Sequence, residues 1–121
     1  MKFKNIIWDW NGTLVDDAYL FVDVMNQSLS NYGLEKINVK KYKNSFCFPI
    51  QKYWEKLGFV FNDCEFNTLN ASFINQYKER MFEPALKNKA LLVLKKINKL
   101  ACRQFVLSAS EHKILNQLVK F

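Results

Sequence analysis

The sequence predicts an α/β fold in which parallel strands form a partial core and a block of helices is inserted between them. Two short apolar segments have the character of strands, Phe3–Trp8 and Gln104–Leu107, and polar residues follow each of them at once. Between the two, apolar residues recur at spacings of three and four, which is typical of amphipathic helices. This order favours a right-handed crossover that places the two strands side by side and parallel.

The first strand, Phe3–Trp8, is apolar, and we expect it to be buried on both faces. It ends at Asp9, and Gly12 lets the chain turn three residues later. Ligands of open α/β sheets bind beyond the carboxyl ends of the strands, and a carboxylate there can act as a nucleophile. The simpler interpretation is a strand-to-helix turn in which Asp16 or Asp17 caps the helix.

The stretch Asp9–Asp16 resembles motif I of the haloacid dehalogenase (HAD) superfamily, Asp-x-Asp-Gly-Thr-Leu-x-Asp, with Asn11 in place of the second acid. The variant WDWNGTL is similar to that of the phosphoglycolate-phosphatase-like hydrolases. The resemblance implies a Rossmann-like core and an aspartyl-phosphate intermediate on Asp9. It also implies Mg²⁺, held by Asp9 and the backbone carbonyl of Asn11, and it assigns Thr13 to the substrate-binding loop.

The segment FVLSAS resembles motif II of the same family, an apolar strand followed by Ser or Thr. That resemblance assigns Ser108 the hydroxyl that binds phosphate. We expect the backbone N–H groups of Ala109 and Ser110 to lie at a helix start, where an anion is favoured. Ordinary helix capping produces the same pattern. In a parallel sheet, Asp9 and Ser108 would face one another across one pocket.

The helical insertion is predicted from periodicity and from helix stop signals. Its expected helices are Leu14–Ser30, Val39–Ser45, Ile50–Leu57, and one from a cap at Asp63 to Phe82. The predicted domains are therefore residues 1–16 with 83–121 as the partial core and residues 17–82 as a helical cap. In the resembled family such a cap closes over the active site, whereas a plain helical bundle would show the same periodicity.

Two further helices are predicted beyond the insertion. The first is Lys89–Leu100, and the second begins at Glu111 and runs to Lys120. In the first of these, five apolar residues are expected to face inward: Ala90, Val93, Leu94, Ile97 and Leu100.

Composition narrows the possible partners. A formal net charge of +7 would suit nucleic acid or phosphorylated metabolites. The lysines are scattered, however, so we expect a solvated surface and no nucleic-acid partner. Three cysteines without a CxxC pair predict reduced thiols in a cytoplasmic protein. A zinc site is not expected because His112 is the single histidine, and no apolar run approaches the length of a membrane span.

The sequence departs from the family pattern in two ways. An amide at Asn11 cannot shuttle a proton at neutral pH, and general acid–base catalysis contributes about 10²- to 10⁴-fold in rate. The basic residue of motif III and the acidic pair of motif IV cannot be assigned. We therefore expect a chain truncated after motif II, whose partner would be a second copy in a homodimer or a missing C-terminal half.

The leading hypothesis is a Mg²⁺-dependent phosphatase that acts on a small, phosphoglycolate-like phosphorylated metabolite, with no membrane partner. Two alternatives stay open. The chain could be a catalytically inactive remnant or half of a split enzyme, or it could be a basic module that binds nucleic acid.

Overall fold

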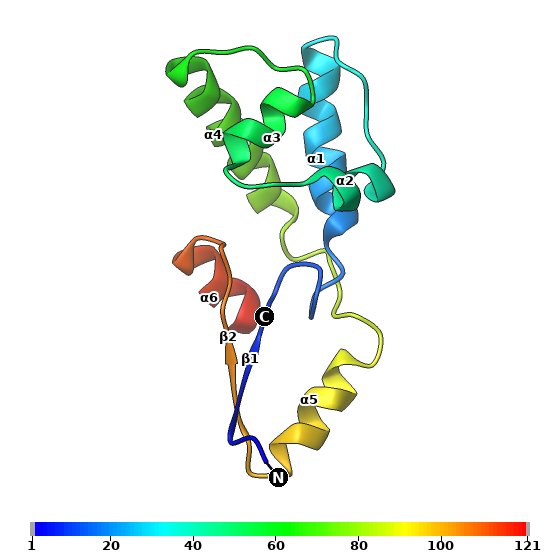
Figure 1. Cartoon of the computed structure of the whole chain (residues 1–121), viewed down its shortest axis with the longest axis vertical. Coiled ribbons are helices and arrows are strands. Elements are labelled where there is room, and N and C mark those ends of the chain that lie inside the picture. Colours follow the sequence, from blue (N-terminus) through cyan, green and yellow to red (C-terminus); the bar gives the residue numbers. More distant parts are fainter. Residues whose placement is uncertain (1, 121) are drawn as a thin grey trace. The chain divides into compact units, whose positions relative to one another are not determined.

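The computed structural model describes residues 2–120, apart from the side chain of Asp63. It divides into two compact units (Figure 1). Residues 2–17 and 82–120 form one, called here the core unit, and Ala18–Met81 form the other, called here the helical unit. The chain leaves the core unit directly after the first strand and its loop, and it returns to that unit before the second strand.

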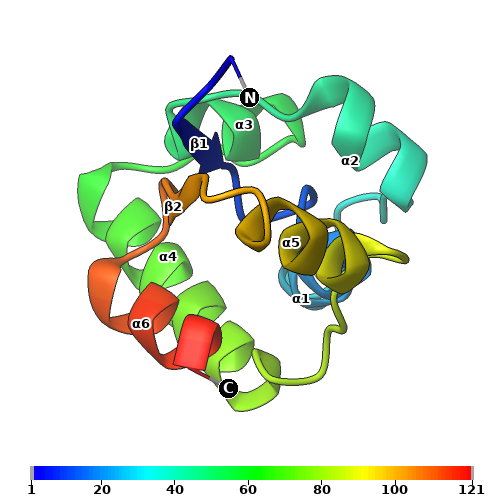
Figure 2. The same cartoon turned by 90° about the horizontal axis from the view of Figure 1, so that it is seen from below.

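The core unit contains the parallel strands that the sequence predicts. Strands β1 (Asn5–Trp8) and β2 (Arg103–Val106) pair in parallel, with Ile7 opposite Phe105. Helix α5 (Ala90–Asn98) precedes β2, and α6 (His112–Lys120) follows it. Figure 2 shows both helices beside the strands. This mixture of helices and parallel strands confirms the predicted α/β class with a partial Rossmann-like core.

Only one face of this strand pair is covered, so the expectation of burial on both faces is wrong. Trp8 and Val106 of the strands pack against one buried cluster, as do Leu94 of α5 and Leu115 and Leu118 of α6. That cluster consists of Trp10, Leu14, Val15 and Ala90. On the opposite face, Ile7 is 67% exposed and Phe105 is 48% exposed. Successive side chains of a strand point to opposite faces, and within residues 2–120 both helices that flank β2 pack on the same face.

The same incomplete covering corrects the predicted inward face of α5. Ala90 is buried at the start of the helix, and Leu94 packs on the core cluster. Val93 and Leu100, in contrast, are exposed. Amphipathic spacing finds the stripe of a helix that can be buried, but the neighbouring elements decide how much of that stripe is covered.

The helical unit consists of α1 (Ala18–Asn31), α2 (Val39–Ser45), α3 (Ile50–Lys56) and α4 (Asp63–Arg80). Its core gathers around Trp54 and Tyr53 of α3 and Met25 and Leu29 of α1, all of them buried. The Trp54 ring meets the rings of Phe59 and Phe73 edge-on. The unit therefore has a hydrophobic core of its own.

Helix α1 begins at Ala18 and not at the predicted Leu14, because backbone hydrogen bonds hold the preceding residues in a loop. The Leu14 carbonyl accepts the Lys87 N–H at 2.7 Å, and the Asp16 N–H donates to the Ala85 carbonyl at 2.9 Å. Val15 also forms an antiparallel bridge with Leu86. These tertiary bonds override the helical periodicity of residues 14–17.

Helix α4 is capped by Asn62 and not by Asp63. The Asn62 side chain accepts the Glu65 N–H at 2.9 Å, and the Glu65 carboxylate accepts the Asn62 N–H at 3.2 Å. This reciprocal capping box satisfies two N–H groups that a helix start leaves without partners. Glu65 stands three residues after Asn62 and selects that residue as the cap.

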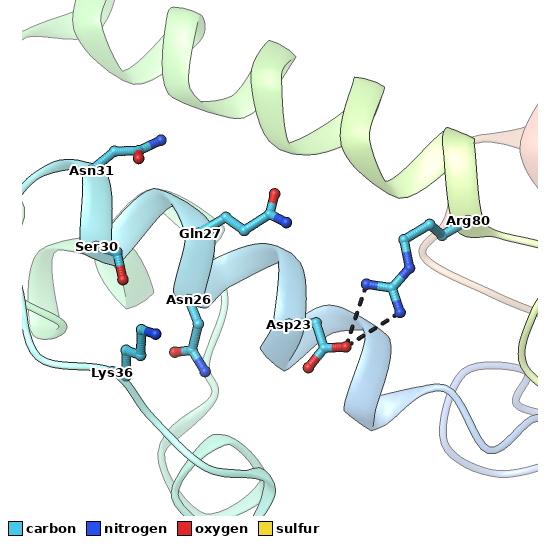
Figure 3. A pocket seen from close by; sticks show the side chains of 7 residues that line it. All are labelled: Asp23, Asn26, Gln27, Ser30, Asn31, Lys36 and Arg80. Carbon is cyan, nitrogen blue, oxygen red and sulfur yellow. Dashed lines mark hydrogen bonds and ion pairs between the residues drawn. The ribbon is translucent and has the colours of Figure 1, made fainter.

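A polar hollow of about 560 Å³ lies on the helical unit. Arg80 of α4 reaches across it to Asp23 of α1, with 3.2 Å between the guanidinium nitrogen and the carboxylate oxygen (Figure 3). An exposed ion pair of this kind adds at most about 1 kcal/mol to stability. The hollow is lined by Asp23, Asn26, Gln27, Ser30, Asn31, Lys36 and Arg80.

Within residues 2–120, no helix combines the length and the apolar character that a bilayer crossing requires. Cys47, Cys64 and Cys102 are free thiols.

Candidate active site

The loop that follows β1 is folded around a single backbone carbonyl. The carbonyl oxygen of Trp10 accepts the N–H groups of Thr13, Leu14 and Val15 at 3.1–3.2 Å. Gly12 makes this tight turn possible, because its φ of +72° lies in a region where a residue with a Cβ is strained. The sequence therefore places a rigid loop directly beyond the carboxyl end of a strand.

Asp9 opens this loop, and hydrogen bonds hold both of its carboxylate oxygens. Its Oδ1 accepts the Trp10 N–H at 2.9 Å, and its Oδ2 accepts the Thr13 hydroxyl at 3.0 Å. The side chain is nevertheless exposed. Each carboxylate oxygen has two lone pairs, so Asp9 keeps acceptor sites for a ligand while its orientation is held.

Asn11 joins the loop to the end of β2. Its Oδ1 accepts the Ser110 hydroxyl at 2.9 Å and the Ser108 hydroxyl at 3.3 Å. Its Nδ2 donates to Oδ2 of Asp17 at 2.7 Å. The structure thus brings Asn11 together with residues 97 and 99 positions away in the chain.

Asp17 is a site residue that the sequence offered only as a possible helix cap. It is 3% exposed, and its Oδ1 accepts the Gly12 N–H at 2.9 Å. Burial raises the pKa of its carboxyl above the ordinary 3.8, and the hydrogen bonds from Asn11 and Gly12 partly oppose that rise. The sequence feature that could have identified Asp17 as a site residue was its position as a second acid directly after Asp16, the last residue of motif I.

Ser108 and Ser110 belong to the loop between β2 and α6. The Ser108 hydroxyl also accepts the Ser110 N–H at 3.1 Å. Helix α6 begins at His112, one residue after the predicted Glu111, so the N–H groups of Ala109 and Ser110 precede its first turn. The Ser110 hydroxyl was missed, although FVLSAS contains it.

The raised pKa of Asp17 predicts how stability depends on pH. A folded-state pKa above the unfolded value means that the folded chain holds the proton more tightly, so this group favours folding below pH 3.8. That contribution is lost as the pH rises through the folded-state pKa. The melting temperature of the wild type minus that of Asp17→Asn should therefore fall as the pH is raised from 4 to 7. A constant difference in thermal unfolding would contradict this expectation.

The donor set fits Mg²⁺ only in part. Among the described residues, no group of three or more His, Cys, Asp and Glu side chains converges on one point. Asp9 offers a carboxylate, and Asn11 two residues on can offer its backbone carbonyl. Mg²⁺ commonly binds through one or two carboxylates and completes its shell with water and substrate phosphate. These residues could hold such an ion only together with those other ligands.

Residues 6–121 match the sequence profile of the haloacid dehalogenase-like hydrolases. Because the match spans almost the whole chain, the chain belongs to this family, which confirms the resemblance seen in its two motifs.

Solved structures share the fold at low sequence identity. A Bacteroides fragilis protein assigned as a haloacid dehalogenase-like hydrolase superposes with a TM-score of 0.85 at 15% identity, over 98% of this chain and 57% of its own. A Haemophilus somnus protein predicted to be a phosphoglycolate phosphatase gives 0.77 at 18% identity, over 97% and 58%. A HAD family hydrolase from Deinococcus radiodurans, solved with bound phosphate and sodium, gives 0.65 at 18% identity, over 98% and 52%.

The chain therefore spans a little more than half the length of the solved structures that it matches. The search among curated proteins returned no match.

Proposed function

We propose that this chain carries the nucleophile of a Mg²⁺-dependent phosphatase that hydrolyses a small phosphorylated metabolite. The observation that carries the proposal is the exposed Asp9 carboxylate, oriented at both oxygens directly beyond a strand. Family membership supports hydrolase chemistry. The Haemophilus somnus and Deinococcus radiodurans neighbours support a phosphorylated, phosphoglycolate-like substrate.

In the proposed reaction, an Asp9 oxygen attacks phosphorus, and the bond from phosphorus to the alcohol oxygen breaks. This step leaves an aspartyl-phosphate, which water then hydrolyses to phosphate and the free carboxylate. Ser108 would hold a phosphate oxygen, while Thr13 keeps Asp9 turned toward phosphorus. The Asp9 carboxylate and the backbone carbonyl of Asn11 would hold Mg²⁺, whose charge offsets that of the phosphate.

The proposed chemistry favours substrates with good leaving groups. An amide side chain cannot donate a proton at neutral pH, so the departing alcohol oxygen must take its proton from water. Both polar atoms of the Asn11 side chain are also already hydrogen-bonded, the nitrogen to Asp17 and the oxygen to the two serines. Esters of acidic alcohols, such as p-nitrophenyl phosphate, should therefore react faster than alkyl phosphates.

The remaining parts of the proposal concern the helical unit and a partner. We propose that the helical unit is a cap that selects the substrate.

Within residues 2–120, no ion pair joins a Lys, Arg or His to Asp9. We propose that a second copy or a further polypeptide supplies positive charge at the phosphate.

Removing the metal tests the proposed function. The purified chain should release phosphate from p-nitrophenyl phosphate in the presence of Mg²⁺, and EDTA should reduce the release to the uncatalysed rate. Adding Mg²⁺ back in excess should restore it, because the metal offsets the charge that develops on phosphate. Release that persists in EDTA would contradict the proposal. No release under any of these conditions would rule out the purified chain, alone or as a homodimer, as a phosphatase.

A further inference from the structure

We propose that Asp17 positions the side-chain amide of Asn11 through their hydrogen bond. We further propose that this hydrogen-bonded pair is preserved when aspartate and asparagine exchange positions. The catalytic side of this proposal rests on the proposed phosphatase function. Its structural side rests only on hydrogen bonds within the core unit.

Asp17 determines which way the Asn11 amide faces. Its Oδ2 accepts Asn11 Nδ2 at 2.7 Å, and its Oδ1 accepts the Gly12 N–H at 2.9 Å. A carboxylate can only accept hydrogen bonds, so Asn11 must turn its nitrogen toward Asp17. The bond to Asn11 is short, as expected when the acceptor is charged. The carbonyl oxygen of Asn11 is thereby directed away from Asp17.

That orientation sets the hydrogen bonds of the two serines. Since Asn11 presents its carbonyl oxygen, both hydroxyls must donate to it, Ser110 at 2.9 Å and Ser108 at 3.3 Å. A serine hydroxyl has one proton to donate. Ser108 can therefore donate to a phosphate oxygen only after it releases Asn11. Asp17 thus acts on the proposed phosphate-binding hydroxyl through Asn11, which makes it a positioning residue.

Neither single exchange preserves this arrangement. Asn11→Asp would place a second carboxylate 2.7 Å from the first, where like charges repel and a hydrogen bond between them forms only if the pair takes up a proton. Asp17→Asn can still accept the Gly12 N–H through its oxygen. Its nitrogen would then face the nitrogen of Asn11, unless Asn11 turns over and gives the serines a donor in place of an acceptor.

The double exchange, Asn11→Asp with Asp17→Asn, preserves the four hydrogen bonds that link Asn11 to Asp17 and to the two serines, and Asp17 to Gly12. The new amide at position 17 accepts the Gly12 N–H through its oxygen and donates through its nitrogen to the new carboxylate at position 11. That carboxylate still accepts both serine hydroxyls. In the bond between residues 11 and 17, the donor and the acceptor change places. A carboxylate then occupies position 11, where the motif of the family has its second acid.

A double-mutant cycle tests the proposal by thermal unfolding. Each single variant should lower the melting temperature by about 5–10 °C, since each disrupts a hydrogen bond to a buried charged group. The double variant should melt within about 2 °C of the wild type. Asn88→Asp changes an exposed turn residue of the same unit in the same way and should have no effect. A double variant whose loss equals the sum of the two single losses would overturn the proposal.

Two further readouts separate positioning from a merely structural role. In ¹H–¹⁵N NMR spectra, the Asn11 side-chain amide should shift in Asp17→Asn and stay in place in Asn88→Asp; an unmoved Asn11 signal in Asp17→Asn would overturn the proposal. Phosphate release from p-nitrophenyl phosphate should exceed that of the wild type only in the double variant. Restored melting without Mg²⁺-dependent release from any variant or the wild type would support the pair and contradict the phosphatase.

Discussion

Asp9→Asn is expected to reduce phosphate release from p-nitrophenyl phosphate by on the order of 10⁴-fold or more, the scale seen when an enzyme loses its nucleophile. An amide oxygen is a far weaker nucleophile than a carboxylate. The amide can still accept the Thr13 hydroxyl or the Trp10 N–H, so the loop should keep its shape. Phosphate release is measured with saturating Mg²⁺ on the variant and the wild type purified side by side.

The matched control is Asp23→Asn, which makes the same change from carboxylate to amide on α1. Asp23 is an exposed residue whose ion pair with Arg80 lies at the surface, so its loss should leave phosphate release within about twofold of the wild type. Equal melting temperatures for Asp9→Asn and the wild type would show that the lost activity is chemical. Undiminished release by Asp9→Asn would rule out Asp9 as the nucleophile.

Trp54→Ala is expected to lower the free energy of unfolding of the helical unit by about 3–5 kcal/mol, the usual range for removing a buried aromatic side chain. Trp54 is 1% exposed, and its ring contacts Phe59 and Phe73 edge-on, with centroids 5.2 and 5.9 Å away. Its removal leaves a cavity at the centre of that core. Urea unfolding followed by circular dichroism measures the loss.

Trp54→Phe is the control that separates packing from the indole nitrogen. That nitrogen is buried and has no hydrogen-bond partner among the described residues, so replacing indole by phenyl removes an unsatisfied donor while an aromatic ring remains. We expect a loss below about 1.5 kcal/mol. A Trp54→Ala loss no larger than that of Trp54→Phe would show that the site collapses without a cavity.

Local features of the chain could be predicted because their causes lie within a few residues. Gly12 marks the tight turn beyond β1, and the helix Val39–Ser45 has the predicted bounds. Helix starts were harder to predict, because they depend on which residue caps the helix and on hydrogen bonds to distant parts of the chain. Asn62 caps α4 through Glu65, while residues 14–17 are held by hydrogen bonds to the returning chain at residues 85–87.

The amino-acid sequence by itself determined the α/β class, the family, and the two loops in which Asp9 and Ser108 lie, because these follow from hydrophobic period and from short contiguous motifs. Only the tertiary structure decided that Asp17 turns inward to Asn11 and that Ser110 joins Ser108 on the same amide. It also decided that Ile7 and Phe105 stay exposed. The spacing of apolar residues shows which positions of an element can be buried. Whether these side chains are buried, and which groups they bond, depends on residues that are almost a hundred positions away in the chain.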